Sequence, residues 1–299
     1  MSSFTTPPIW EAQNSEGSLR LLSAQRQTYS DAKVLHFSRV FIVVFCGIGA
    51  VILTFSVQSF RPILGAIAGF FLLILALASS AREKRKIESA AAMQEIFDTG
   101  VFKIPRSAKV KMASPSAADV ARASLRHKGK DLKDWYGIES PIARPLDVLI
   151  CQRANLGWGI ATHRAWAAFN LWFGLLVLLI VTMASAMSDL TLVQALLGVY
   201  APLIPALKEA ADAWVKNQQS AKAKEELESS ADKLWGSSMK SAKVPSESQC
   251  RKIQDGILET RMSGALIPDW FNRLMRKREE KVMRLSATDY VEQSAAAGF

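Results

Sequence analysis

The sequence lacks the patterns that usually mark an enzyme. Its three cysteines, Cys46, Cys151 and Cys250, lie too far apart for a CxxC metal site, and their odd number predicts no disulfide framework. The three histidines form no HExxH motif, and no GxSxG, Walker or GxGxxG motif occurs. Proline (11) and glycine (16) show no period, which excludes a collagen-like or disordered chain. We therefore expect a folded protein that is not an enzyme, uses no cofactor or metal, and keeps its thiols reduced.

Charged residues are absent from four long segments, and about half of the chain is apolar (49%). The segments run from Val40 to Val57, Pro62 to Ala81, Ala165 to Ser188 and Leu190 to Leu207. Each is close to the ~20 apolar residues with which a helix crosses ~30 Å of hydrocarbon. A wholly soluble domain is therefore not expected. Because no acid or base lies inside any segment, a proton-coupled or ion-coupled transporter is disfavoured as well.

The four apolar segments form two pairs, and each pair is joined by a short turn. Residues 58–61 join the first pair and the surroundings of Asp189 join the second, so two helical hairpins are predicted. Basic residues gather directly after the first pair, in the range 82–86, whereas the two turns share only Arg61. The positive-inside rule then places both termini and the central segment in the cytoplasm. Residues 1–39 do not read as a cleavable signal peptide.

The rest of the sequence has helical periodicity, and no strand-period alternation is long enough to predict a sheet. The expected fold class is therefore all-α, an integral membrane protein with four transmembrane helices in two hairpins and a cytoplasmic helical bundle. Its expected parts are an N-terminal helix (1–39), a first transmembrane hairpin (40–81), a central cytoplasmic segment (82–164), a second hairpin (165–207), and a helical stalk with C-terminal helices (208–299).

Capping and breaking residues set the expected helix boundaries. Ser18 is the expected cap of the first helix, and a helix restarts at Ser114–Pro115, where proline takes the first helical position. A single helix is expected from Leu146 to Arg164, where it feeds the third span. The stalk is expected from Lys208 to Trp235, because that stretch contains no proline or glycine, and Gly236 is expected to break it.

Glycine and proline also occur inside the apolar segments. Gly65 and Gly69 form a GxxxG pair, and Gly47 lies in the neighbouring helix, so close helix contact is expected within one subunit or between subunits. Pro202 and Pro205 remove two backbone donors from the fourth span, which predicts a kink or hinge near the inner leaflet.

Some arginines stand among aromatic and amide side chains, and these form the candidate ligand site. Guanidinium groups bind phosphates in a forked geometry, and tryptophan and tyrosine rings stack on bases. Such a set suits an anionic, nucleotide-like ligand, although the same residue types also form ordinary buried networks between helices. The candidate residues are Gln25, Arg26, Tyr29, Trp135, Tyr136, Arg153, Asn155 and Trp158.

Two other patterns have plainer interpretations. The basic runs Arg82–Lys86 and Arg273–Arg278 suit attraction to anionic lipid at ~1 kcal/mol per residue near the surface. Cys151, with His163 and Asp147, could be arranged as a nucleophilic group. A buried helical cysteine beside polar residues near the membrane edge is the favoured interpretation of that set.

Three blocks of the chain resemble a known family, the SMODS-associated four-transmembrane effectors of bacterial cyclic-oligonucleotide antiphage defence. The first block is SLRLLSAQRQTYSDAK (Ser18 to Lys33), and the second is DWYGIESPIARPLDVLICQRANLGW (Asp134 to Trp158). The third is RKIQDGILETRMSGALIPDWFNRLMRKREEKVM (Arg251 to Met283). With the two hairpins, the resemblance covers nearly the whole chain. In one departure, Gly159 follows Trp158, where an acid is common in the family, so another group would have to orient any ligand-facing arginine.

The resemblance implies an effector that disrupts the bacterial inner membrane when a cyclic oligonucleotide activates it, which kills the infected cell. The expected partners are that ligand, the lipid bilayer and further copies of the chain in a homo-oligomer, with no DNA or RNA polymer. Two alternatives from other classes are a membrane scaffold that docks a protein partner and an ungated channel.

Overall fold

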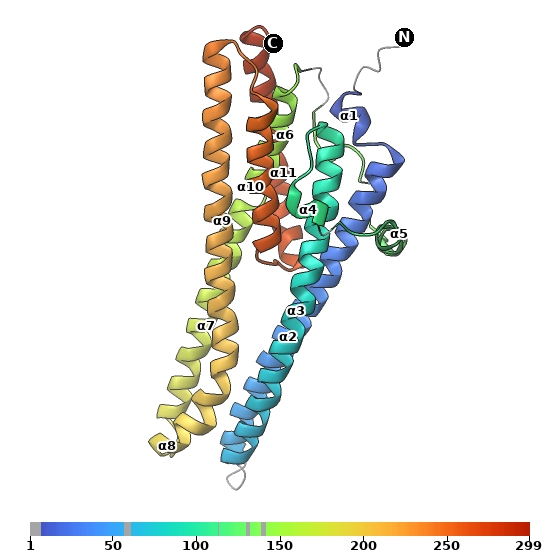
Figure 1. Ribbon diagram of the computed structural model, residues 1–299. Helices are drawn as coiled ribbons and strands as arrows, with labels where there is room; N and C mark the ends of the chain where they lie inside the picture. Colours follow the sequence, from blue (N-terminus) through green and yellow to red (C-terminus); the bar gives the residue numbers. More distant parts are fainter. Residues whose placement is uncertain (1–6, 57–60, 113, 130–131, 139–141) are drawn as a thin grey trace.

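The structure is a computed structural model that describes the chain except residues 1–6, 57–60, 113, 130–131 and 139–141. It does not describe the side chains of residues 54, 61–80, 111–112, 277–278 and 284. Every regular element in the described ranges is helical (Figure 1). The elements are α1 (Ile9–Ala12), α2 (Glu16–Ser56), α3 (Arg61–Phe102), α4 (Ala108–Met112), α5 (Ala117–Arg126), α6 (Leu146–Gly157), α7 (Ile160–Ala186), α8 (Leu192–Ala195), the π-helix η1 (Leu196–Tyr200), α9 (Ala201–Ser241), α10 (Glu247–Ser263) and α11 (Asp269–Ala296). This confirms the all-α prediction for the described part of the chain.

Two long antiparallel pairs organise the molecule. Helices α2 and α3 form one pair and α7 and α9 form the other. Helices α1, α4, α5, α6, α10 and α11 lie in the half that also holds both termini, whereas the short α8 lies at the opposite end (Figure 1). Among the described residues, two stretches are long and apolar enough to cross a membrane, Glu16–Leu53 and Leu146–Ala186. The first and third predicted spans overlap these stretches and extend a few residues beyond their ends.

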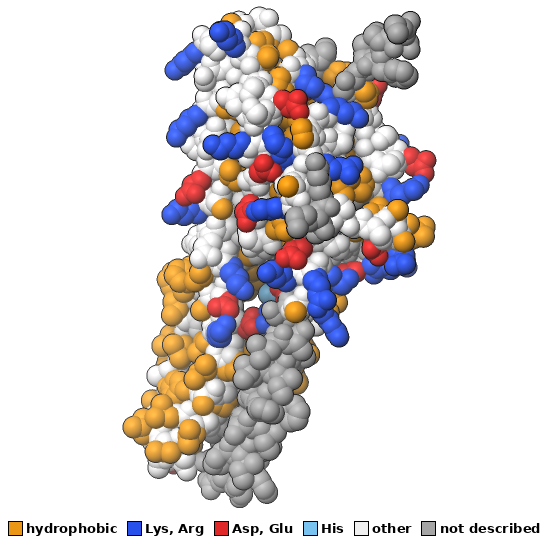
Figure 2. All heavy atoms as spheres, in the orientation of Figure 1, with side chains coloured by type: hydrophobic (Ala, Val, Ile, Leu, Met, Phe, Trp, Pro, Cys, Tyr) orange, Lys and Arg blue, Asp and Glu red, His pale blue; other side chains and the backbone are white. Residues whose placement is uncertain are grey.

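Apolar side chains cover the outside of the half of the molecule that lies away from the two termini. On the face shown in Figure 2 they spread over α7 and α8, while acidic and basic side chains crowd the other half. The exposed apolar residues include Phe41, Phe45, Trp172, Leu179, Met187 and Leu192. A surface of this size and composition is typical of contact with lipid rather than water.

The charged half is built around one hydrophobic core. Leu22 of α2, Phe97 and Phe102 of α3, and Leu149 of α6 are almost completely buried together. Ile257 of α10 completes this cluster, so residues far apart in the sequence hold the bundle together. Burying a large side chain of this kind contributes roughly 1.5–3 kcal/mol.

Three predicted helix boundaries are wrong. Helix α2 begins at Glu16, before Ser18, and α5 begins at Ala117 with Ser116 as its cap, because the Ser116 side chain accepts a hydrogen bond from the Asp119 backbone N–H. Helix α9 continues through Gly236 to Ser241. Burial of Trp235 and Ser238 on that turn offsets the weak helix propensity of one glycine.

The single helix expected from Leu146 to Arg164 is instead two helices. Helix α6 ends at Gly157 and α7 starts at Ile160, with Trp158 as the C-cap of the first helix. Between them Gly159 has φ 87°, a left-handed conformation that glycine adopts without a steric penalty. The break lies just before the third predicted span, which begins at Ala165.

The fourth predicted span is irregular. Its residues are divided among α8, η1 and the start of α9, and the π-helical turn lies directly before Pro202. A π-turn is one way to accommodate a proline inside a helix, because it shifts the hydrogen-bond pattern locally. A Cβ on Gly47 would lie 3.1 Å from the Pro202 carbonyl oxygen, so this glycine lets the two long pairs approach closely.

Candidate functional site

A buried polar network ties α3 to α10 and to Tyr136, which lies in the segment before α6. Asp98 accepts hydrogen bonds from Tyr136 (2.6 Å), Arg261 (2.6 Å) and Gln254 (3.0 Å). Glu95, one turn earlier, pairs with Arg251 (2.8 Å). We call Glu95, Asp98, Tyr136, Arg251, Gln254 and Arg261 the buried network.

The buried network balances its charges internally. The side chains of Glu95 and Asp98 are fully buried, and each pairs with one arginine of α10. Burial raises the pKa of Tyr136 well above its usual range, so its hydroxyl remains a hydrogen-bond donor to Asp98. Removing either partner of such a pair leaves an uncompensated buried charge. These contacts are therefore suited to fixing the helices in place.

A second polar region lies beside the buried network, along α2. Arg26, Tyr29 and Lys33 follow one another at spacings of three and four residues, so they share one side of that helix. Lys33 pairs with Asp269 at the start of α11 (2.5 Å). We call Arg26, Tyr29 and Lys33, together with Lys224 of α9 and Arg261 of α10, the α2 seam.

The cations of the α2 seam are balanced only in part. Within the described part of the chain, neither Arg26 nor Lys224 forms an ion pair, and the buried Nη2 atom of Arg261 has no hydrogen-bond partner. The Arg26 guanidinium carbon lies 5.5 Å from the Trp135 ring centroid, a cation–π contact. Lys224 Nζ donates to the Trp158 carbonyl oxygen (2.8 Å).

Burial and like charge together affect the titrating groups here. Burial and, to a smaller extent, the nearby Arg261 charge lower the pKa of Lys224, and Glu279 opposes the shift. The resulting pKa is about 8. Burial raises the pKa of Tyr29 to about 12, so its hydroxyl stays protonated at neutral pH. A lysine with such a pKa gains a proton more readily when an anion binds beside it.

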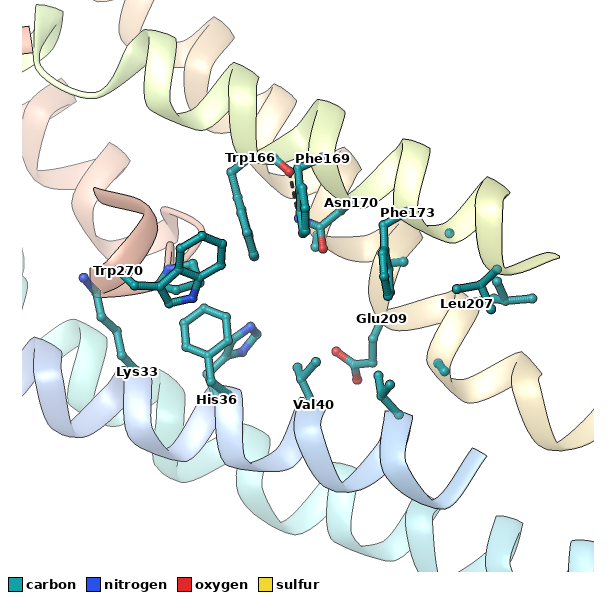
Figure 3. Close-up of a pocket in the computed structure, with 18 of the residues that line it drawn as sticks. Lys33, His36, Val40, Trp166, Phe169, Asn170, Phe173, Leu207, Glu209 and Trp270 are labelled. Carbon is teal, nitrogen blue, oxygen red and sulfur yellow. Dashed lines mark hydrogen bonds between the residues drawn. The ribbon is translucent and has the colours of Figure 1, made fainter. Parts of the chain in front are cut away.

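A cavity of about 520 Å³ adjoins the seam at its membrane end. Helices α2, α7 and α9 and the start of α11 line it, as Figure 3 shows. Lys33 and Trp270 lie at one end of the view, and Phe173 and Leu207 lie at the other. Its size falls in the range of small-molecule sites.

Charged residues also connect the two long pairs beside this cavity. Arg39 of α2 pairs with Glu209 of α9 and lies 3.7 Å from Glu83 of α3. His36 bonds to the same Glu83 through Nδ1 (3.1 Å). These four residues, which we call the latch, are largely buried at the expected membrane edge.

The eight residues predicted from the sequence fall into three places. Arg26, Tyr29 and Trp135 lie at the α2 seam, with Gln25 buried next to them and donating to Gln94 (3.3 Å). Tyr136 and Asn155 belong to the buried interior, where Asn155 donates to the Tyr136 hydroxyl (2.8 Å).

Arg153 lies apart from those six, whereas the backbone carbonyl of Trp158 contacts Lys224 of the α2 seam. Arg153 bonds to Asp232 (2.5 Å), lies 3.6 Å from Glu228 and stacks on Tyr290, so its charge is balanced within the protein. Trp158 is partly exposed at the α6–α7 break.

Sequence reasoning missed Lys224, Glu95 and Asp98, because they lie in charged helical stretches that look solvated. Their partners Arg251, Gln254 and Arg261 do belong to the third quoted block, which was the one signal that could have indicated the network.

The nucleophile interpretation of Cys151 finds no support in the contacts. Burial raises the pKa of this thiol well above its usual range. His163 bonds to Asn217 (2.8 Å), and Asp147 pairs with Arg144 (3.0 Å). Among the described residues, no group of three or more His, Cys, Asp or Glu side chains is arranged to hold a metal ion.

Comparison with known proteins decides the family. The model of the SMODS-associating 4TM effector domain matches residues 7–290. The chain belongs to this family. A probable CBASS effector molecule from Bacillus cereus (strain VD146) is 24% identical to this 4TM effector over 286 residues, which cover 91% of this chain and 95% of that protein. No solved structure matches this chain.

Family membership and the two apolar helices together indicate an antiphage defence effector at a membrane. The structure also bears on the departure at Gly159. A carboxylate lies beside this position, because Glu279 of α11 accepts a hydrogen bond from the Gly159 backbone N–H (3.4 Å). Glu279 also acts electrostatically on Lys224, so an acid from another helix is present near the seam of this 4TM effector.

Proposed function

We propose that this 4TM effector disrupts the bacterial inner membrane when a cyclic oligonucleotide binds at the α2 seam. The observation that carries the proposal is a set of cations that lack a full complement of partners within the described part of the chain. Arg26 lies against Trp135 and forms no ion pair, Lys224 contacts only a backbone carbonyl oxygen, and the buried Nη2 of Arg261 has no hydrogen-bond partner. A cyclic oligonucleotide carries one phosphodiester per nucleotide, so separate cations suit its separate phosphates. An indole ring offers a face on which a base can stack.

In this proposal the membrane part consists of four helices in two hairpins, with both termini in the cytoplasm. The two apolar helices found among the described residues and the basic cytoplasmic half support that placement. The proposed site includes Lys33 of α2, in the first hairpin, and Lys224 of α9, in the second, and burial together with the charges of both lysines lowers the pKa of His163. Ligand binding there can therefore bias how the two hairpins sit against each other.

The proposed response is a change of packing that separates or repacks the hairpins, with several subunits acting together. The latch joins the hairpins in the observed arrangement, so its Arg39–Glu209 pair must break if they separate. A shift from 1:99 to 99:1 requires a ligand to favour one state by ~5.5 kcal/mol. Several sites in an oligomer supply this more readily than one.

The test is dye release from liposomes that contain the purified full-length protein, titrated with a panel of cyclic di- and trinucleotides. We expect release with one member of the panel. Arg26→Ala should weaken the response at least about tenfold, because a charge-assisted hydrogen bond contributes ~1.5–3 kcal/mol.

Arg20→Ala is the matched control, since Arg20 lies on the same helix, is exposed and, among the residues that the structure describes, pairs only with Glu16 (2.6 Å). It should respond like the wild type. Release without any ligand would instead favour an ungated channel, and silence across the panel from inserted, folded protein would favour a membrane scaffold. Equal responses from the Arg26 and Arg20 variants would move the ligand away from the seam.

A further inference from the structure

We propose that the cavity between the two long pairs is a binding site for one phospholipid of the cytoplasmic leaflet. The lipid phosphate would lie at Arg273 and Lys33, and an acyl chain would extend between the pairs. This inference rests on the proposed placement of the hairpins in the membrane, but not on the cyclic oligonucleotide.

The position of the cavity is the first argument. Its lining on α2 extends from Ser30 to Ile48 and its lining on α7 from Trp166 to Val177. The uncharged segments begin at Val40 and Ala165. The cavity therefore straddles the level at which the chain is expected to enter the bilayer, with one end in the headgroup region and the other in hydrocarbon.

The residues that line the cavity change from charged to aliphatic between its cytoplasmic end and its membrane end. Lys33, Asp269 and Arg273 lie at the cytoplasmic end, whereas Val44, Ile48 and other aliphatic side chains lie at the membrane end. Figure 3 shows Lys33 and Val40 on the same helix, with Phe173 across from it on α7. A wholly polar ligand would leave the aliphatic part unfilled, and a wholly apolar one would cover Arg273 without giving it a counter-ion. A phospholipid satisfies both ends.

The charges at the cytoplasmic end favour a phosphate. Lys33 is balanced by Asp269, and Glu209 is balanced by Arg39. Arg273 forms no ion pair within the described part of the chain, and it is exposed at the cavity. One unpaired guanidinium matches the single negative charge of a phosphodiester.

Aromatic rings mark the same level. Trp166 lies 5.9 Å from Trp270 in an edge-to-face arrangement, and Phe169 stacks on Trp166 at 5.1 Å. Tryptophan rings gather where hydrocarbon meets the headgroups of a bilayer. A lipid in this cavity would lie between α2 of the first pair and α7 and α9 of the second, so its occupancy would set the separation of the pairs.

The test is native mass spectrometry of the purified full-length protein after incubation with phosphatidylglycerol, followed by stripping with detergent. We expect one lipid to be retained per chain. Val44→Trp, which fills the aliphatic part, should lose it, whereas Ile42→Trp should keep it, because Ile42 lies on the same helix but is exposed outside the cavity. Arg273→Gln should bind about tenfold more weakly.

A second filling variant, Val40→Phe, covers the case in which Val44→Trp does not fold. Glycerol phosphate serves as a probe without acyl chains, and its retention in place of the lipid would overturn the proposal. Equal lipid loss from the Val44 and Ile42 variants would overturn it as well. Because no cyclic nucleotide or dye release is involved, failure here is distinct from failure of the proposed effector activity.

Discussion

The buried network and the α2 seam lie side by side but differ in whether their cations have carboxylate partners. In the network, Glu95 and Asp98 each pair with an arginine of α10, and the amide of Gln254 bridges them. In the seam, Arg26 and Lys224 have ring and carbonyl partners but no carboxylate partner within the described part of the chain. The first arrangement suits a rigid frame and the second suits an anion that comes from outside.

Arg261 belongs to both regions. Its Nη1 atom donates to Asp98, and its Nη2 atom is buried without a partner. A guanidinium fixed at one end by a carboxylate is already ordered before a ligand arrives, so little conformational entropy is lost on binding. The buried network therefore orders Arg261 of the α2 seam before any ligand binds.

The largest expected effect on the free energy of unfolding comes from removing a carboxylate of the buried network. Asp98→Ala should destabilise the protein by about 3–5 kcal/mol, because it leaves the largely buried Arg261 without its counter-ion. Denaturant unfolding of the purified protein in detergent measures this. Asp212→Ala is the control, since Asp212 pairs with Lys208 on the surface of α9 and such pairs contribute ~0–1 kcal/mol. A loss of similar size in both variants would show that the network is not a frame.

The sequence predicts the frame less well than the fold. Apolar length and helical periodicity correctly indicate an all-α chain, because these signals are local. The partners of Asp98 are Tyr136 and Arg261, which lie 38 and 163 residues away, and no local pattern connects them. Charged residues in the α3 stretch therefore look solvated from sequence alone.

The candidate site was predicted in part. Arg26, Tyr29 and Trp135 do come together, because the notable mixture of residue types lies on one helix face and one turn. Arg153 looks equivalent in the sequence but is balanced by Asp232 and Glu228. Only three-dimensional packing distinguishes an arginine with carboxylate partners from one without them.

Two glycine substitutions should have intermediate effects, one at the break between α6 and α7 and one inside α9. Gly159→Ala should destabilise the protein by ~1–2 kcal/mol, because φ 87° is a left-handed conformation that alanine adopts poorly. Gly236→Ala should stabilise it by ~0.5–1 kcal/mol, since Gly236 lies inside α9 and an added Cβ would meet nothing within 4 Å. Thermal unfolding of both variants gives the two signs, and a stabilising Gly159→Ala would contradict the observed break between α6 and α7.

The last prediction concerns the titration of Lys224, whose pKa is about 8 in the folded protein. A bound anion favours the charged amine, so affinity for a cyclic oligonucleotide should fall about tenfold between pH 7 and pH 9 as the free site loses its proton. Without ligand the sign is opposite: the unfolded chain keeps this proton to about pH 10.4, so this lysine makes the fold more stable as pH rises from about 8 to 10.

Lys224→Arg separates these two effects, because arginine stays charged throughout this range. Calorimetric binding of the activating nucleotide at pH 7 and pH 9 should show the drop for the wild type and a flatter profile for the variant. Arg261 remains charged as well, and the Tyr29 hydroxyl, with a pKa of about 12, stays neutral across the range. A wild-type affinity that is unchanged at pH 9 would place the ligand away from Lys224, and with it away from the part of the seam that faces α9.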